Sequence, residues 1–167
     1  MITDAYDEIQ AALDAPLIVV TTEVDGERSG CLVGFHSQSS IEPRQHCIWI
    51  SKANHTYQLA RRATHFALHF LTEYDHSLAQ HFGELTGDET DKFDGLPFSA
   101  GPGNVPILDG CEHWVVIERA TMQDEDAAGD HACITGTVIA AKSSGTFRPF
   151  RLTQAKDFTP GHEAEEA

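Results

Sequence analysis

The chain has 167 residues, of which 41% are hydrophobic, and a formal net charge of −15 from 26 acidic and 11 basic side chains. A surface this acidic repels phosphate backbones and anionic headgroups, so nucleic acid and membrane are excluded as partners. No stretch approaches the roughly 18 apolar residues that span a bilayer. The length is that of one domain. We expect a single domain over 1–167, with a core over about 15–152 and a flexible acidic tail over 158–167.

The N-terminus and the cysteines indicate a cytoplasmic protein. Residues 1–4 provide neither the basic nor the apolar segment of a secretory signal. The cysteines form no CxxC pair, and they lie beside apolar residues, as reduced and buried thiols do. They are Cys31, Cys47, Cys111 and Cys133.

Apolar periodicity predicts six or seven strands and two or three short helices. In the first helix, Ile9 and Leu13 are four residues apart and share a face that can dock on the body. The Asp25-Gly26 step between two apolar runs is a strong hairpin signal. The expected strands cover 17–22, 29–35, 47–50, 66–71, 114–121, 131–141 and 146–151, and the expected helices cover 5–14, the residues after an N-cap at Asn54, and 76–85.

Hairpins, not βαβ units, dominate this order. We therefore expect a mainly β fold, an antiparallel β-barrel with short helices, in which closure removes exposed strand edges. Residues 86–110 are rich in Gly, Asp and Pro and predict a long loop. Long loops in compact domains are often functional.

Two polar runs could hold a phosphate-bearing ligand. Residues 37–40 form a hydroxyl and amide run at the end of an apolar strand, and residues 51–56 join a strand to a helix. The start of a helix presents free N–H groups, and Lys52 adds a full positive charge just ahead of it. From these residues alone, an equally good interpretation is that Asn54 or Thr56 caps the helix and Lys52 is solvated.

Two further groups are ambiguous when taken alone. His131 follows a Gly-Asp step and could face a pocket, but an exposed histidine in a surface turn is the better interpretation. Lys92 and Phe93 could cover a planar, anionic ligand, although Phe93 anchoring its loop in the core is slightly favoured.

The ten histidines do not predict a metal site. His65 and His69 are four apart, which on a strand is too far for one metal, and no HExxH motif or clear third ligand accompanies them. The sequence also lacks GxSxG, Walker-type and GxGxxG motifs, so a nicotinamide enzyme of this kind would not have a Rossmann fold.

The order of these motifs resembles the flavin reductase-like family, whose fold is an FMN-binding split barrel, a Greek-key-type antiparallel barrel. The resemblance spans roughly residues 15–142. It is carried by Val19-Val20-Thr21-Thr22, Gly30-Cys31-Leu32-Val33-Gly34-Phe35, Ser37-Gln38-Ser39-Ser40-Ile41-Glu42-Pro43, Ser51-Lys52-Ala53-Asn54-His55-Thr56, Phe66-Ala67-Leu68-His69-Phe70-Leu71, Ala79-Gln80-His81-Phe82-Gly83, Asp91-Lys92-Phe93 and Gly129-Asp130-His131.

The resemblance implies an NAD(P)H:flavin oxidoreductase with FMN or FAD as flavin and NADH or NADPH as co-substrate. It also implies a homodimer with flavin near the subunit interface, and a monooxygenase partner that receives reduced flavin. It places His131 near the nicotinamide as the catalytic residue. The implied flavin-binding residues are Ser37, Gln38, Ser39 and Ser40 along the ring and ribityl chain, Ser51, Lys52, Ala53, Asn54 and Thr56 around the phosphate, and Lys92 and Phe93 beside the flavin or the nicotinamide.

Two departures from the family pattern bear on the cofactor. Many members carry two prolines where this chain has Pro43-Arg44, and Arg44 could reach a second phosphate, which would suit FAD. His69 stands where many members carry Asn. The alternatives are a flavin-binding or electron-transfer protein with little reductase activity, or a split barrel that binds deazaflavin or haem, with His69 or His36 as axial ligand.

Overall fold

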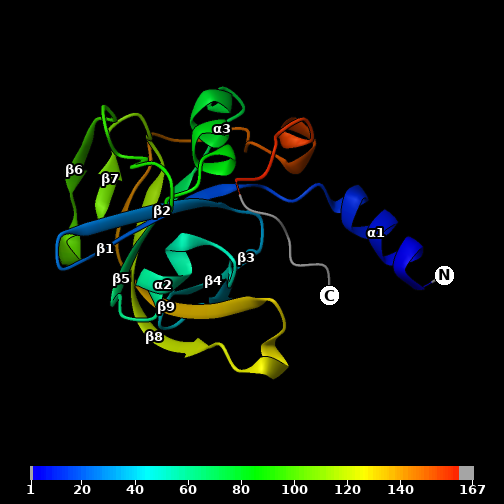
Figure 1. Cartoon of the computed structure of the whole chain (residues 1–167), viewed down its shortest axis with the longest axis horizontal. Coiled ribbons are helices and arrows are strands. Elements are labelled where there is room, and N and C mark those ends of the chain that lie inside the picture. Colours follow the sequence, from blue (N-terminus) through cyan, green and yellow to red (C-terminus); the bar gives the residue numbers. More distant parts are fainter. Residues whose placement is uncertain (1, 162–167) are drawn as a thin grey trace.

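A curled antiparallel sheet is the central element of the computed structural model, which describes residues 2–161 (Figure 1). Its strands follow the order β2-β1-β5-β8-β9-β4-β3, and a separate hairpin pairs β6 with β7. The strands are β1 Ile18–Val24, β2 Glu27–Val33, β3 His36–Ser40, β4 Gln45–Ser51, β5 His65–Phe70, β6 Phe98–Ala100, β7 Pro106–Leu108, β8 Trp114–Gln123 and β9 His131–Lys142. The helices are α1 Ile2–Leu13, α2 His55–Ala60 and α3 His76–Glu84, with 3-10 turns η1 Pro102–Asn104, η2 Asp126–Ala128 and η3 Leu152–Ala155.

The first hairpin forms as the sequence predicts. Val24 pairs with Glu27, so the turn between β1 and β2 has two residues. Asp25 and Gly26 have φ of 52° and 86°, the positive values that a tight hairpin turn requires and that Asp and Gly tolerate best.

Strand β1 is buried on both faces, which explains why residues 17–22 are continuously apolar or β-branched. Ile18 and Val20 belong to one core cluster, which α2 and Ala60 help to close. Leu17 and Val19 belong to a second cluster, into which α3 inserts Phe82. Helices α2 and α3 therefore cover opposite faces of the β1–β2 end of the sheet.

The mainly antiparallel β fold with short helices is confirmed, with three local differences from the expected strands and loops. Residues 37–40 form part of the strand β3, because they pair with β4 at the edge of the sheet. Residues 146–151 form no strand: Pro149 and Arg151 make isolated bridges, and a proline supplies no N–H to a ladder. The long loop over 86–110 contains the β6–β7 hairpin.

Helix α1 does not dock on the body through Ile9 and Leu13, contrary to the sequence prediction. None of its twelve residues, all of them described, is buried, and it stands clear of the sheet (Figure 1). Of the predicted tail, residues 162–167 lie outside the described part of the chain. Phe158 packs on Phe150 and His76.

All four cysteines are free, three of them buried and Cys133 half-buried. Among residues 2–161, no helix is both long enough and apolar enough to cross a membrane.

Candidate functional site

A cavity of about 510 Å³ lies where the ends of β2, β4 and β9 meet, and we call it the His131 cavity. Strand alternation explains its walls. Ile48 and Ile50 face the core, so Trp49 and Ser51 face the cavity. The cavity is lined by Cys31, Leu32, Val33, Gly34, Phe35, Trp49, Ser51, Lys52, Ala53, Asn54, Asp126, Gly129, Asp130 and His131.

The pairing of β4 with β9 brings the two predicted groups together. Ser51 lies opposite His131 in the register. The Lys52 N–H donates to the Asp130 carbonyl at 2.9 Å, which continues the ladder by one step. Residues that are about 80 positions apart in the sequence thus form one wall of the cavity.

His131 is oriented by its neighbours. Its Nδ1 lies 2.7 Å from Asp130 Oδ1, so Nδ1–H donates to the carboxylate, and this bond lowers the pKa of Asp130. Among residues 2–161, Nε2 has no hydrogen-bond partner, so it is the nitrogen that a ligand can reach. The ring of Phe35, itself 59% exposed, lies 4.9 Å from the His131 ring.

Lys52 is the positive charge at this cavity. Its Nζ donates to the Glu125 carbonyl at 3.2 Å, and within the described residues it forms no ion pair. A backbone carbonyl carries no full negative charge, and Lys52 acts on the Asp130 carboxylate without forming an ion pair, by helping to lower the pKa of Asp130. The ammonium can therefore still bind an anion.

The start of α2 contributes less to anion binding than the sequence suggests. Asn54 caps the helix, because its Oδ1 accepts from the Thr56 N–H at 2.9 Å. The Ala53 N–H donates to Ser51 Oγ, so it is not free for a ligand. Thr56 is buried, and its hydroxyl bonds to that of Ser29 at 2.8 Å, away from the cavity. The capping interpretation of Asn54 is therefore confirmed, and Lys52 is the stronger candidate for an anion.

The structure does not bring the hydroxyl run into this cavity. Ser37, Gln38 and Ser39 are exposed on the edge strand β3 and bond locally, with Ser37 Oγ donating to the Gln38 carbonyl. The adjoining residues 31–35 line the cavity in their place. The sequence did not identify residues 31–35 as a binding wall, because apolar residues in a strand predict a place in the hydrophobic core. The signal that could have found them is Gly34, which separates two strands beside an exposed aromatic residue.

Lys92 and Phe93 also lie outside the His131 cavity. Lys92 is buried, and its Nζ donates to the carbonyls of Gly30 at 2.9 Å and Phe82 at 3.2 Å. Phe93 packs against the rings of Phe82 and Phe98. The anchoring interpretation of Phe93 therefore matches its burial.

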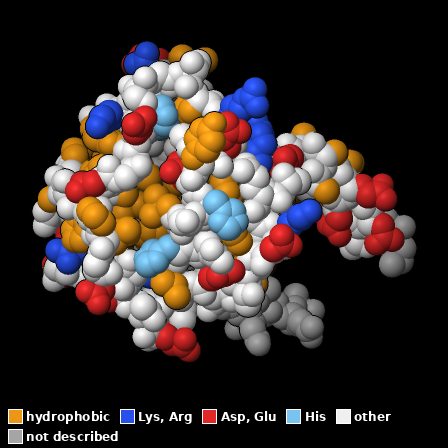
Figure 2. Space-filling view, turned by 90° about the horizontal axis from the view of Figure 1, so that it is seen from above, with side chains coloured by type: hydrophobic (Ala, Val, Ile, Leu, Met, Phe, Trp, Pro, Cys, Tyr) orange, Lys and Arg blue, Asp and Glu red, His pale blue; other side chains and the backbone are white. Residues whose placement is uncertain are grey.

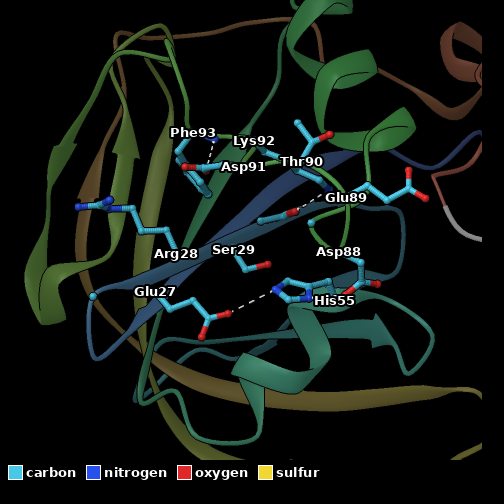
Figure 3. A pocket seen from close by; sticks show the side chains of 13 residues that line it. Glu27, Arg28, Ser29, His55, Asp88, Glu89, Thr90, Asp91, Lys92 and Phe93 are labelled. Carbon is cyan, nitrogen blue, oxygen red and sulfur yellow. Dashed lines mark hydrogen bonds and ion pairs between the residues drawn. The ribbon is translucent and has the colours of Figure 1, made fainter.

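These two residues border a second cavity of about 410 Å³, which we call the acidic cavity (Figure 3). Its His55 lies between Glu27 Oε1 at 3.5 Å and Asp88 Oδ1 at 2.7 Å. Arg28 points away from His55 in Figure 3, and its guanidinium lies over the Phe98 ring. Four carboxylates line this cavity, those of Glu27, Asp88, Glu89 and Asp91, against two in the His131 cavity, those of Asp126 and Asp130. The His131 cavity, which has Lys52 in its wall, is therefore the better anion site.

The two histidines considered as haem ligands, His69 and His36, are hydrogen-bonded through both ring nitrogens. His69 Nδ1–H donates to the Val19 carbonyl at 3.1 Å, and its Nε2 accepts from the Leu108 N–H at 3.0 Å. Burial lowers the pKa of His69 to about 4, so the ring is neutral. His36 bonds to the Pro16 carbonyl and to His46. Neither ring offers a free lone pair to iron.

Comparison with known proteins gives one family. Residues 11–153 match the sequence profile of the flavin reductase like domain. The chain is 28% identical over 151 residues to the stachydrine N-demethylase reductase subunit of Rhizobium meliloti, which covers 87% of this chain and 63% of that protein. It is 26% identical over 156 residues to an NADH:riboflavin 5′-phosphate oxidoreductase of Streptomyces pristinaespiralis, with 92% of this chain and 85% of that protein covered.

A solved structure supports the fold. The FMN-binding protein from Thermus thermophilus superposes with a TM-score of 0.70 at 25% identity, over 77% of this chain and 70% of that one. The curated relative from Rhizobium meliloti is longer, and the chain spans a little under two thirds of its length.

Proposed function

The chain belongs to the flavin reductase-like family, and on this premise we propose that it is an NAD(P)H:flavin oxidoreductase. The observation that carries the proposal is the meeting of Lys52, Phe35 and His131 on one cavity. An unpaired cation, an exposed aromatic ring and an oriented imidazole suit a ligand that is planar at one end and anionic at the other. The name of the Streptomyces relative supports the same activity.

The bound flavin would supply the redox chemistry, by accepting a hydride from the nicotinamide. The residues of this chain bind and orient. We infer that Lys52 holds the flavin phosphate, with Ser51, Ala53 and Asn54 beside it, and that residues 31–35 with Trp49 contact the ring. His131 would lie by the nicotinamide, with its Nε2 free for a hydrogen bond while Asp130 fixes the ring through Nδ1.

We propose FMN as the preferred flavin. Arg44, the candidate for a second phosphate, precedes the seven-residue strand β4, whereas Lys52 follows it. An extended strand of that length separates its ends by about 20 Å. The two phosphorus atoms of a pyrophosphate are neighbours, so Arg44 and Lys52 of one chain do not serve the same FAD molecule.

The partners follow from the relatives. The Rhizobium protein is named as the reductase subunit of a demethylase. We propose that this chain likewise supplies reduced flavin to a monooxygenase, and that it forms a homodimer with flavin near the interface.

The test is a steady-state assay of the purified protein that crosses FMN and FAD with NADH and NADPH. Oxidation of a nicotinamide that depends on added flavin, with a lower KM for FMN, supports the proposal. Flavin binding without oxidation of either nicotinamide would instead support a storage or electron-transfer protein. A protein that binds neither flavin would overturn the assignment of the His131 cavity.

A further inference from the structure

The His131 cavity has room for one drug-sized ligand. Its volume of about 510 Å³ lies within the range of sites for such ligands, roughly 300–1,000 Å³. A flavin and a dinucleotide together are larger than one such ligand. A nicotinamide that meets the flavin beside His131 therefore leaves its adenosine half outside the cavity, against the surface that borders it.

Two segments that border the cavity carry no lysine or arginine. The first is the turn between β8 and β9, residues 124–130, which we call the acidic turn. It projects from the sheet (Figure 1) and carries carboxylates at positions 124, 125, 126 and 130. The second begins with Phe35 in the cavity wall and follows the edge strand β3 as far as Glu42. A ligand that extends from the cavity along either segment meets carboxylates and no cation.

The acidic turn is held against the cavity by bonds to the segment around α2. Lys52 Nζ donates to the Glu125 carbonyl at 3.2 Å, and the Tyr57 hydroxyl donates to Asp124 Oδ2 at 3.1 Å. Asp126 lines the cavity itself. Among residues 2–161, the Asp126 carboxylate forms no ion pair, so its negative charge is not neutralised.

The positive charges of the chain are occupied or distant from His131. Lys52 is assigned to the flavin phosphate, and Arg61 Nε lies 3.8 Å from a carboxylate of the acidic turn. Arg44 precedes the seven-residue strand β4, about 20 Å from Lys52. Lys142 ends the twelve-residue strand β9, about 35 Å from its first residue. The cavity is not lined by any of the other basic residues, which are Arg28, Arg62, Lys92, Arg119, Arg148, Arg151 and Lys156.

The 2′-phosphate by which NADPH differs from NADH is unfavourable beside these carboxylates. A phosphate monoester carries a charge of about −1.5 to −2 at pH 7, and like charges repel. The surface as a whole adds no attraction, because the chain has a net charge of −15 and acidic side chains outnumber basic ones on the face drawn in Figure 2.

We propose that this chain oxidises NADH in preference to NADPH, and that Asp126 is the residue that disfavours the 2′-phosphate. The preference rests on the proposed function, in which the nicotinamide meets the flavin beside His131. Asp126 determines specificity and takes no part in hydride transfer, because both dinucleotides donate the same hydride from the same ring. Salt screens surface charges, with a Debye length that falls from about 10 Å at 0.1 M to about 3 Å at 1 M, so the preference weakens as salt is added.

The first measurement is kcat/KM for NADH and for NADPH with saturating FMN, at low and at high salt. In the wild-type chain the ratio of the two constants favours NADH by roughly tenfold or more at low salt and falls at high salt. Asp126→Lys lowers the ratio by roughly tenfold, because a cation then faces the 2′-phosphate. Asp94→Lys is the matched control, since it makes the same change of charge at an exposed residue outside the His131 cavity and leaves the ratio unchanged.

The second measurement is isothermal titration calorimetry of NAD⁺ and NADP⁺ against the FMN-loaded protein, which reports binding without turnover. NAD⁺ is expected to bind more tightly than NADP⁺, and Asp126→Lys is expected to narrow the difference. Both substituted positions are exposed, so folding is retained, and far-UV circular dichroism checks it.

A wild-type chain that uses both dinucleotides equally, or NADPH better, overturns the preference. Equal shifts in Asp126→Lys and Asp94→Lys overturn the assignment to Asp126, because net charge and not position would then set the ratio. A ratio that salt leaves unchanged overturns charge repulsion as its cause. Oxidation of neither dinucleotide overturns the proposed function and the preference with it, whereas equal oxidation of both leaves the proposed function intact.

Discussion

The rings of Phe35 and His131 lie 4.9 Å apart and are tilted by 51° at the His131 cavity. Phe35 follows β2 and His131 opens β9, so the contact joins two ends of the sheet that are distant in sequence. Asp130 fixes the imidazole through Nδ1. This arrangement gives the cavity an aromatic wall beside a nitrogen that can form one further hydrogen bond.

Replacing Lys52 with alanine is expected to weaken FMN binding by about 1–3 kcal/mol, the range for a lost charge-assisted hydrogen bond. A titration of flavin fluorescence measures the change. Arg44→Ala is the control, since it removes the same charge at the far end of β4. Equal losses in both variants would show a general electrostatic effect and not a phosphate site at Lys52.

His131→Ala should slow flavin reduction by NADH more than it weakens flavin binding, because the histidine is proposed to contact the nicotinamide. Stopped-flow absorbance gives the reduction rate, and the fluorescence titration gives the affinity. Asp130→Asn keeps the imidazole and replaces the carboxylate that orients it, so a smaller reduction in rate is expected. If the affinity falls while the rate is unchanged, His131 is a flavin ligand.

The stability of the protein is expected to fall as the pH drops from about 6.5 to about 4, partly through His69. Burial lowers the pKa of His69 to about 4, below the value of about 6.5 in the unfolded chain. Between these values the unfolded state binds the extra proton, so acid favours unfolding, by up to roughly 3 kcal/mol from this group.

His69→Asn isolates that contribution. The asparagine amide can donate to the Val19 carbonyl in place of His69 Nδ1–H, and it does not titrate. The shorter side chain gives up the bond from the Leu108 N–H to Nε2, which lowers stability equally at every pH. Urea unfolding at several pH values should show a shallower loss of stability in the variant. Identical pH profiles would assign the acid sensitivity to other groups.

Lys92→Met should destabilise the fold by about 1–3 kcal/mol, because the buried carbonyls of Gly30 and Phe82 lose their donor. Urea unfolding measures this change. We expect FMN affinity to fall less than in Lys52→Ala, since the Lys92 ammonium is turned into the interior. If Lys92→Met weakens FMN binding by more than it lowers the free energy of unfolding, Lys92 contributes to the flavin site.

Local structure and family membership could both be predicted from the sequence alone. The Asp25-Gly26 hairpin, the Asn54 cap and most strands depend on backbone preferences and on burial along one segment, which neighbouring residues report directly. Lys52 and His131 were also identified from local motifs, as a cation before a helix and a histidine after a tight turn.

Which of these groups lie together depends on contacts between segments that are distant in the sequence. The register of β4 on β9 places Ser51 opposite His131. The end of β2 and the two residues after it line the cavity, while residues 37–40 pair at the sheet edge. The Lys92 side chain points into the interior, where it donates to the carbonyls of Gly30 and Phe82, which lie 62 and 10 residues away in the sequence. Ile9 and Leu13 of α1 stay exposed, and the chain after the helix is tied to the body by the bonds of Asp14 to Thr153. Such contacts join segments that are distant in the sequence, so no local sequence pattern predicts them.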